Sequence, residues 1–182
     1  VMLDVGTSGQ WDENVGGSTK GIRLGSVLKV GSTLYMFYAS DNAGKIGVAT
    51  SSDGATWTKS GSNPILTGTG QGRNDASTVS HPAVIEESGT WTMVYGYDLA
   101  SLPGLRSATS SDGIAWTKTG SGDVMRLDSG GLVHEFHHLR KLGTNDYILL
   151  MEAGNGSTAF AIYVGHAKSA DGPYTSSAAW FE

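Results

Sequence analysis

The sequence contains no cysteine, only four prolines and little charge. Without cysteine the chain has no disulfide bond, no thiolate metal site and no cysteine nucleophile. The 12 lysines and arginines are scattered and the formal net charge is −5, so we expect no nucleic-acid partner. Apolar runs such as "YILLMEA" are far shorter than the roughly 20 residues of a spanning helix, so we expect no membrane partner either.

The sequence also lacks the 3.6-residue apolar periodicity of amphipathic helices, so we expect little helix. Glycine is plentiful, at 27 of 182 residues, and serine, threonine and asparagine are abundant as well. Together with the low content of charged residues, this composition favours a secreted or cell-surface protein of bacterial type.

Internal repeats organise the chain. The segment "IGVATSSDGATWTKSGSNPIL" at 46–66 recurs as "LRSATSSDGIAWTKTGSGDVM" at 105–125, and a divergent third copy, "YVGHAKSADGPYTSSAAW", begins at Tyr163. The aspartates of the three Asp-Gly pairs, Asp53, Asp112 and Asp171, are 59 residues apart both times. Each copy follows another recurring segment: "VLKVGSTLYMFYAS", "VIEESGTWTMVYGY" and "LRKLGTNDYILLMEA".

Each repeat is predicted to form four strands. Segments such as "TLYMFYAS" are rich in aromatic and β-branched residues and follow Gly-Ser turns. Asp-Gly between two extended runs indicates a hairpin, because glycine tolerates the positive φ of tight turns. Four antiparallel strands per repeat describe a β-propeller blade, so we expect an all-β fold. Trp57 and Trp116 occupy the same place in two repeats and should pack between blades.

The repeats nearly fill the chain as one domain of residues 1–182, with blades at approximately 5–66, 67–125 and 126–182. Three units of 59 residues account for 177 of the 182 residues. Because single-chain propellers have at least about four blades, three would leave two sheet faces without partners. We therefore expect either a part of a longer propeller or a homo-oligomer, in which two copies could close a six-bladed ring.

The blade pattern, "Y-x-M-x-Y" followed by "IG-x-A-T-S-S-D-G-x-x-W-T-K" and "NP-I-L", resembles the five-bladed propeller glycosidases, glycoside hydrolase family 43 and its relatives. The resemblance covers all three repeats and implies a protein that hydrolyses or binds plant or microbial polysaccharide. Such enzymes place three carboxylates around the propeller axis, because glycoside hydrolysis needs one protonated and one ionised carboxyl group. The resemblance implies no required cofactor and allows a structural metal ion on the axis.

The family's site residues are carried over by aligning the inner strands "IRLGSV", "VSHPAV" and "HEFHHL". Glu135 matches the general acid of the family's E-G-P-H-L stretch, and His138 matches its histidine. In the second repeat, the family's R-D-P-x-V is matched with Pro82 kept, but His81 replaces the acid. In the first repeat the corresponding residue is Leu24. One of the three expected carboxylates is therefore in place.

The missing carboxylates leave two interpretations open. In the first, Glu135 protonates the leaving oxygen, and Asp75 in "GRNDAS" or Asp12 in "QWDEN" activates water from a loop. In the second, the chain is a non-catalytic carbohydrate-binding or assembly propeller, and these aspartates are ordinary turn formers beside glycine, asparagine and serine. The candidate sugar-binding side chains in both cases, with plain packing as the alternative, are His81, His137, His138, Trp11 and Tyr97.

Two further motifs suggest other hydrolases. His134, Glu135 and His138 spell the H-E-x-x-H of zinc metalloproteases, which works on a helix because both imidazoles then reach one ion. The repeats predict a strand over 134–139, where four residues span about 13 Å, too far for a shared metal. The segments "SSDGATW" and "SSDGIAW" resemble the Asp-box of sialidases, but both lack the residue between Asp and Gly. We therefore expect no catalytic metal site.

Overall fold

A computed structural model describes residues 3–13, 21–40, 43–68, 78–98, 104–120, 123–126, 133–154 and 160–179. For strand residues 98, 126, 133–137, 153–154, 160–161 and 176–179 it describes the backbone alone. The described residues form strands, turns and loops and contain no helix. In particular, none of the described segments is an apolar helix long enough to cross a membrane.

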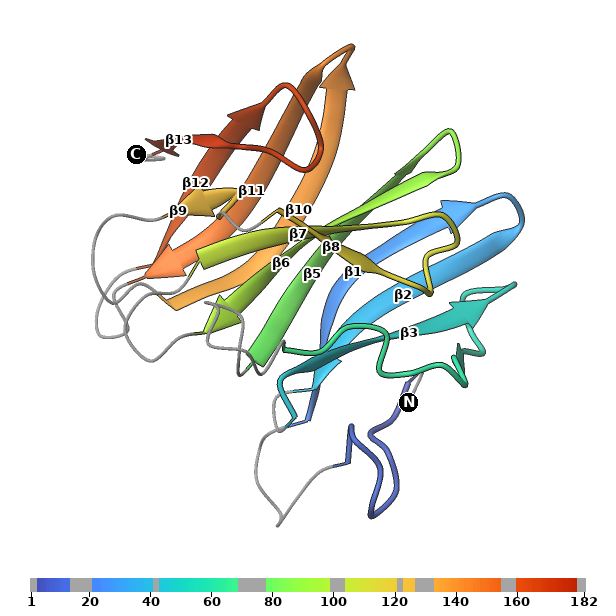
Figure 1. Ribbon diagram of the computed structural model, residues 1–182. Coiled ribbons are helices and arrows are strands. Elements are labelled where there is room, and N and C mark those ends of the chain that lie inside the picture. The colour runs from blue at the N-terminus through green and yellow to red at the C-terminus, as the bar shows by residue number, and fades with distance from the viewer. Residues whose placement is uncertain are drawn as a thin grey trace.

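The strands form three antiparallel sheets that follow one another along the chain (Figure 1). The first sheet consists of β1 (Ile22–Val30), β2 (Thr33–Ser40), β3 (Lys45–Ser51) and β4 (Thr58–Lys59). The second consists of β5 (Thr78–Glu87), β6 (Thr90–Asp98), β7 (Gly104–Ser110) and β8 (Thr117–Thr119), with β9 (Met125–Arg126) paired to β7. The third consists of β10 (Val133–Gly143), β11 (Asp146–Gly154), β12 (Phe160–Ala167) and β13 (Thr175–Ala179).

The sheets fan out side by side, with the second between the other two (Figure 1). Their first strands meet at the centre, where β5 contacts both β1 and β10. Each sheet pairs its four strands in chain order, as a propeller blade does. The predicted all-β propeller architecture of four-stranded antiparallel blades is confirmed, and three blades are present in the described part of the chain.

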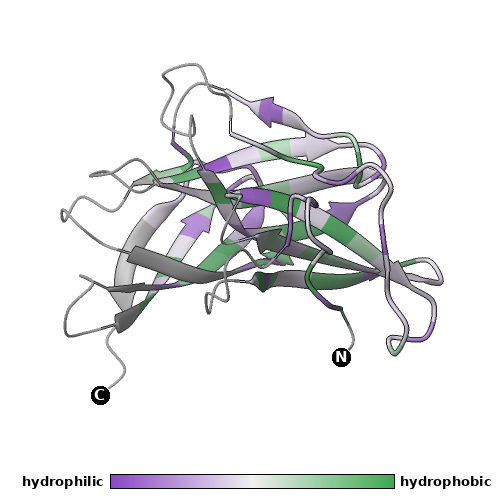
Figure 2. Ribbon diagram, turned by 90° about the horizontal axis from the view of Figure 1, so that it is seen from below, coloured by the Kyte–Doolittle hydropathy of each residue, from purple (hydrophilic) through white to green (hydrophobic). Residues whose placement is uncertain are grey.

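The second sheet is buried on both faces because its strands alternate between two cores. Met93 of β6 faces the first sheet, where it joins Phe37, Val48 and Trp91. The next residue, Val94, faces the third sheet. In Figure 2 the hydrophobic residues lie along the strands at the centre of the molecule. Apolar packing between neighbouring blades therefore holds the fan together.

Aromatic rings connect the first two sheets. Trp91 makes edge contacts with Tyr35 at 4.8 Å and with Phe37 at 6.2 Å between ring centroids. Phe37 also contacts Trp116 at 5.9 Å, which confirms the prediction that Trp116 packs between blades. The matching Trp57 is half-buried, and its indole N–H donates to the carbonyl of Gly54 in its own turn, at 3.1 Å.

The Asp-Gly turns are built by the aspartate side chain. One carboxylate oxygen of Asp53 accepts the backbone N–H groups of Ala55, at 2.8 Å, and Thr56, at 2.9 Å. These two bonds, Thr56 first, lower the pKa of Asp53 below its ordinary value. Gly54 has φ of 74°, which favours glycine at this place. Asp112 repeats the same pattern in the second sheet.

A polar cluster joins the second and third sheets. Glu87, at the end of β5, accepts hydrogen bonds from the ammonium of Lys141 and, at 2.8 Å, from the hydroxyl of Tyr147. Partial burial opposes ionisation of Glu87, but the bonds from Lys141 and Tyr147 outweigh it and lower its pKa. The same contact with Glu87 raises the pKa of Lys141 and of Tyr147.

Candidate functional site

Each of the three central strands contains a β-bulge at a comparable position. A bulge places one extra residue in a strand and redirects the neighbouring side chains, and bulges are common beside active sites. The bulges lie between Leu24 and Ser26 in β1, between Ser80 and Ala83 in β5, and between Glu135 and His137 in β10. The positions aligned from sequence, Leu24, His81 and Glu135, are therefore all at bulges around the axis.

His81 has an unusual backbone conformation at the bulge of β5. Its φ of 49° lies in the left-handed region, which costs a residue other than glycine about 1–3 kcal/mol. Its Nδ1 is 3.0 Å from the hydroxyl of Ser80, which fixes the orientation of the ring. Strain of this kind persists only where the surrounding structure maintains it, and it is concentrated at functional sites.

The central strands β1 and β5 approach each other closely at these bulges. A Cβ atom added to Gly25 would lie 2.4 Å from the carbonyl oxygen of Pro82, so no larger residue fits without moving the backbone. Further along, the hydroxyl of Ser26 accepts the backbone N–H of Val84 at 3.1 Å. These contacts hold the bulge of β5, and with it His81, against β1.

β10 confirms the prediction of a strand over 134–139. The side chains of His134, Glu135 and His137 lie outside the described residues. The backbone over 134–139 is thus extended, whereas H-E-x-x-H brings its two imidazoles to one ion on a helix. Among the side chains that the structure describes, no three histidine, aspartate or glutamate groups gather as metal ligands.

His138 pairs instead with Arg140, the next residue on the same face of β10. The guanidinium Nε of Arg140 donates to Nε2 of His138 at 2.9 Å. Partial burial, and then the charge of Arg140, lowers the pKa of His138 below its ordinary value. Both residues line a cavity of about 450 Å³ between β1, β5 and β10, together with Lys29 and Glu86.

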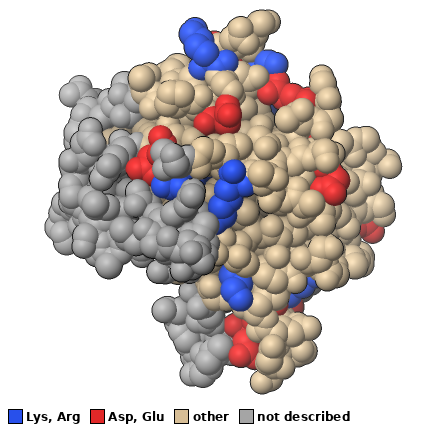
Figure 3. Space-filling view, viewed as in Figure 1, with Lys and Arg blue, Asp and Glu red and all other residues tan. Residues whose placement is uncertain are grey.

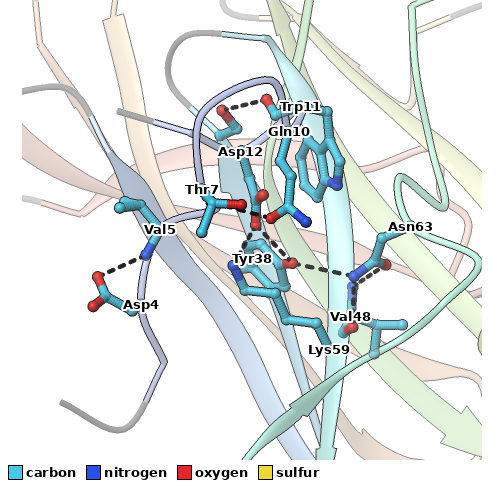
Figure 4. Close-up of polar contacts among 11 residues, drawn as sticks. Asp4, Val5, Thr7, Gln10, Trp11, Asp12, Tyr38, Val48, Lys59 and Asn63 are labelled. Atoms are coloured by element: carbon cyan, nitrogen blue, oxygen red, sulfur yellow. Dashed lines mark hydrogen bonds and ion pairs between the residues drawn. The ribbon is translucent and has the colours of Figure 1, made fainter. Parts of the chain in front are cut away.

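Asp12 and Trp11 lie in the N-terminal segment 3–13, over the outer face of the first sheet (Figure 4). Asp12 is only 2% exposed. Its carboxylate forms an ion pair with Lys59 at 2.7 Å and accepts a hydrogen bond from the hydroxyl of Tyr38 at 3.2 Å. The amide of Asn63 in turn donates to the hydroxyl of Tyr38 at 3.1 Å. Asp12 is therefore a buried partner in a polar network rather than a surface turn former.

Trp11 stacks on Tyr38, with 5.7 Å between ring centroids and 25° between ring planes. A Cβ atom on Gly47 would lie 2.7 Å from the Trp11 ring, so glycine makes room for the indole. These contacts fix the segment to β2, β3 and β4, and its Leu3 lines a small pocket with Ile22, Arg23 and Leu24 of β1. Burial, followed by the nearby Asp12 carboxylate, raises the pKa of Tyr38 well above its ordinary value.

Tyr97 is buried inside the second sheet, at 2% exposure. Its hydroxyl donates to Asp123 at 2.7 Å, and the guanidinium of Arg106 lies 5.4 Å from the ring centroid. In this structure the ring has no open face for a sugar. Asp75 lies outside the described residues. Of the sequence candidates, the structure places His81 and His138 near the axis, and Asp12 and Trp11 together on the outer face.

Sequence reasoning missed several partners at these places. Arg140 could have been found, because it is two residues beyond His138 and so shares its face of the strand. Nothing in the sequence linked Tyr38 and Lys59 to Asp12, since they are 26 and 47 residues from it.

Figure 3 shows few and scattered charged side chains on the face in view and no continuous basic patch there.

The family model described as "Glycosyl hydrolases family 32 N-terminal domain" matches residues 13–178. The chain belongs to this family. The superfamily of propeller glycosidases predicted from the sequence is thereby confirmed, and the family model that matches is that of family 32.

Individual relatives are more distant. The chain is 28% identical over 144 residues to the uncharacterized protein Rv1502 of Mycobacterium tuberculosis, covering 71% of this chain and 44% of the relative. Among solved structures, Zg3597, a family 117 glycoside hydrolase of the marine bacterium Zobellia galactanivorans, is 15% identical with a TM-score of 0.72. The match covers 97% of this chain and 60% of that one.

The Bombyx mori family 32 β-fructofuranosidase BmSUC1 is 16% identical with a TM-score of 0.65, covering 87% of this chain and 37% of that one. At these identities the structural likeness shows a shared fold. The chain spans less than two thirds of the length of each of these three relatives. The fold is thus that of carbohydrate-active propeller enzymes, and what this chain does at its axis has to be argued from its own residues.

Proposed function

We propose that the chain acts on carbohydrate at the propeller axis and cleaves a glycosidic bond with Glu135 as the general acid. The observation that supports this most is the set of matched bulges in β1, β5 and β10, with His81 in a strained conformation at one of them. Membership of a glycosidase family supports the same chemistry. In this proposal Glu135 protonates the oxygen of the leaving group as the bond to the sugar breaks.

A second carboxylate has to activate water on the opposite face of the sugar, about 6.5–9.5 Å from the acid in an inverting enzyme. Asp75 and Asp12 are the candidates. The carboxylate of Asp12 is engaged in an ion pair with Lys59 and a hydrogen bond from Tyr38. That engagement favours Asp75, which precedes the central strand β5 by three residues, as the base.

Two histidines are suited to hold sugar hydroxyl groups. His138 accepts from Arg140 through Nε2, so in the neutral ring Nδ1 bears the proton and is a hydrogen-bond donor. The lowered pKa of His138 keeps the ring neutral at physiological pH. In His138 the ring nitrogen beside a neighbouring side chain is Nε2, whereas in His81 it is Nδ1, which lies beside the hydroxyl of Ser80. Nε2 of His81 is on the opposite side of the ring.

The test is a screen of aryl arabinosides, xylosides, mannosides and fructosides, run alongside a glycan array. Replacing Glu135 with Gln should slow turnover of aryl glycosides with poor leaving groups by about 10²–10⁴-fold and should leave sugar binding unchanged. Asp146→Asn, at the first residue of β11, is the matched control and should leave turnover unchanged. Unaltered turnover in Glu135→Gln would rule out the assignment of the acid.

The second candidate function is carbohydrate binding without hydrolysis. It is favoured by His81 at the place of the family's acid and by the ion pair that engages Asp12. In that case the glycan array detects a ligand, no aryl glycoside is turned over, and His81→Ala weakens binding. Turnover that depends on Glu135 would exclude this second function.

A further inference from the structure

The three Asp-Gly turns share a sequence motif but differ in their hydrogen bonds. In the first turn the carboxylate of Asp53 accepts the backbone N–H groups of Ala55 and Thr56, at 2.8 and 2.9 Å. In the second turn Asp112 accepts the two corresponding N–H groups, each at 2.8 Å. The aspartate side chain is therefore fixed to the backbone that follows it in both of these turns.

The third turn, at Asp171, has neither of these donors. Two residues further on is Pro173, which has no N–H group to donate. Three residues further on is Tyr174, whose N–H donates instead to the carbonyl of Val124, at 2.7 Å. Asp171 keeps the bond from the hydroxyl of Ser169, which has a counterpart in both of the other turns. The difference between the turns is thus the pair of backbone donors.

An Asp-Gly pair can rearrange by itself, because glycine leaves room for ring closure. The backbone nitrogen of Gly172 attacks Cγ of Asp171, and the new N–Cγ bond closes a five-membered succinimide. One oxygen of the protonated carboxyl group leaves as water, together with the proton of the N–H group. Water then adds to the main-chain carbonyl of the ring and breaks its bond to nitrogen. The product is isoaspartate, and because the water lost is regained, no other reactant is needed.

The two backbone donors oppose this ring closure in the first and second turns. The bonds from Thr56 and Ala55 lower the pKa of Asp53, and the corresponding bonds lower that of Asp112, so less of the protonated acid is present. Both bonds also have to break before Cγ reaches the glycine nitrogen. That nitrogen is hydrogen-bonded in all three turns, so the carboxyl group makes the difference.

We propose that Asp171–Gly172 is a site of spontaneous covalent modification in the folded protein, where aspartate converts to isoaspartate while the other two Asp-Gly turns stay intact. Solvent exposure alone predicts the opposite order, since Asp53 and Asp112 are exposed and Asp171 is half-buried. The order of conversion therefore separates control by the hydrogen bonds from control by access of water.

The modification alters a contact between the second and third sheets. The hydroxyl of Ser107, in β7, donates to the main-chain carbonyl of Asp171 at 3.4 Å. In isoaspartate this carbonyl becomes a carboxylate, and the main chain passes through the side chain and is longer by a methylene group. We therefore expect conversion to weaken the attachment of the third sheet and to lower the midpoint of urea unfolding.

The test incubates the folded protein at about 37 °C and about pH 6 and follows the three turns by tryptic peptide mapping. Trypsin separates them because it cleaves after Lys59 and Lys168, among other residues. Isoaspartate has the mass of aspartate, so it is detected by an isoaspartyl methyltransferase and by electron-transfer fragmentation. Asp171 should convert at least about tenfold faster than Asp53 and Asp112, since each hydrogen bond to a charged group contributes about a factor of ten. Similar rates in the three turns, or the slowest rate at Asp171, would overturn the proposal.

The chain unfolded in urea is the matched control, because only the local sequence acts there. The three rates should then be similar. If Asp171 exceeds the other two by the same factor in the unfolded chain, the fold does not set the order and the proposal is wrong.

Two variants exchange the donors between turns. Ala55→Pro removes one donor from the first turn and should raise the rate at Asp53, with the rate at Asp112 unchanged as the internal reference. Pro173→Ala supplies a donor to the third turn and should slow conversion at Asp171; it keeps the comparison available if Ala55→Pro does not fold. A folded variant whose own turn converts at the wild-type rate contradicts the role of the backbone donors.

Discussion

Replacing Asp12 with asparagine removes one partner of the ion pair that fastens segment 3–13 to the first sheet. Asp12 is 2% exposed and Lys59 28% exposed. Breaking a fully buried pair costs about 3–5 kcal/mol, because the remaining charge is left without compensation. Because Lys59 is partly exposed and water solvates part of its ammonium, we expect a cost at or just below the lower limit of that range, about 2–3 kcal/mol in the free energy of unfolding.

Urea denaturation followed by tryptophan fluorescence measures this cost. The double variant Asp12→Asn with Lys59→Met removes both charges and should be more stable than Asp12→Asn alone, because no ammonium is then stranded. Asp4→Asn is the control: Asp4 is exposed in the same segment, and its loss should change stability by less than about 0.5 kcal/mol. A cost for Asp12→Asn as small as that of the control would refute the reasoning.

Two further predictions concern contacts between blades. Trp91→Ala removes the ring that contacts Tyr35 and Phe37 and should cost about 3–5 kcal/mol, measured by urea titration; a cost below about 1 kcal/mol would contradict this packing. Because the pKa of Glu87 is lowered from its ordinary 4.5, its stabilising effect is complete above pH 4.5 and is lost as the pH falls through the lower folded value. The free energy of unfolding of the wild type should therefore fall more steeply below pH 4.5 than that of Glu87→Gln. If the two proteins lose stability in parallel as the pH falls, the ion pair of Glu87 with Lys141 does not stabilise the fold.

The blades could be predicted from the sequence because their determinants are local. Strand alternation and the Asp-Gly turn depend on residues a few positions apart: Asp53 bonds to the backbone only two and three residues away. The same residues recur every 59 positions, so each copy reinforces the interpretation of the others. Element order and strand pairing within each blade follow from that repetition.

What the sequence could not predict depends on long-range contacts. Asp12 looked like a turn former because its partners Tyr38 and Lys59 are far along the chain. The sequence around Trp57 closely matches that around Trp116, but Trp116 has the ring of Phe37, from the preceding blade, beside it. Trp57 has no such blade against it in the described part of the chain. The left-handed backbone conformation of His81 likewise accompanies a long-range contact, the close approach of β1 to β5 at Gly25.

The central claim is that Glu135 donates a proton to a leaving oxygen at the propeller axis. The most direct measurement compares the rate of Glu135→Gln with that of the wild type for aryl glycosides whose leaving groups differ in acidity. A poor leaving group needs the proton, so its cleavage should slow by about 10²–10⁴-fold. A dinitrophenyl leaving group departs without protonation and should react at nearly the wild-type rate. Equal losses for both leaving groups, or no loss for either, would contradict the account.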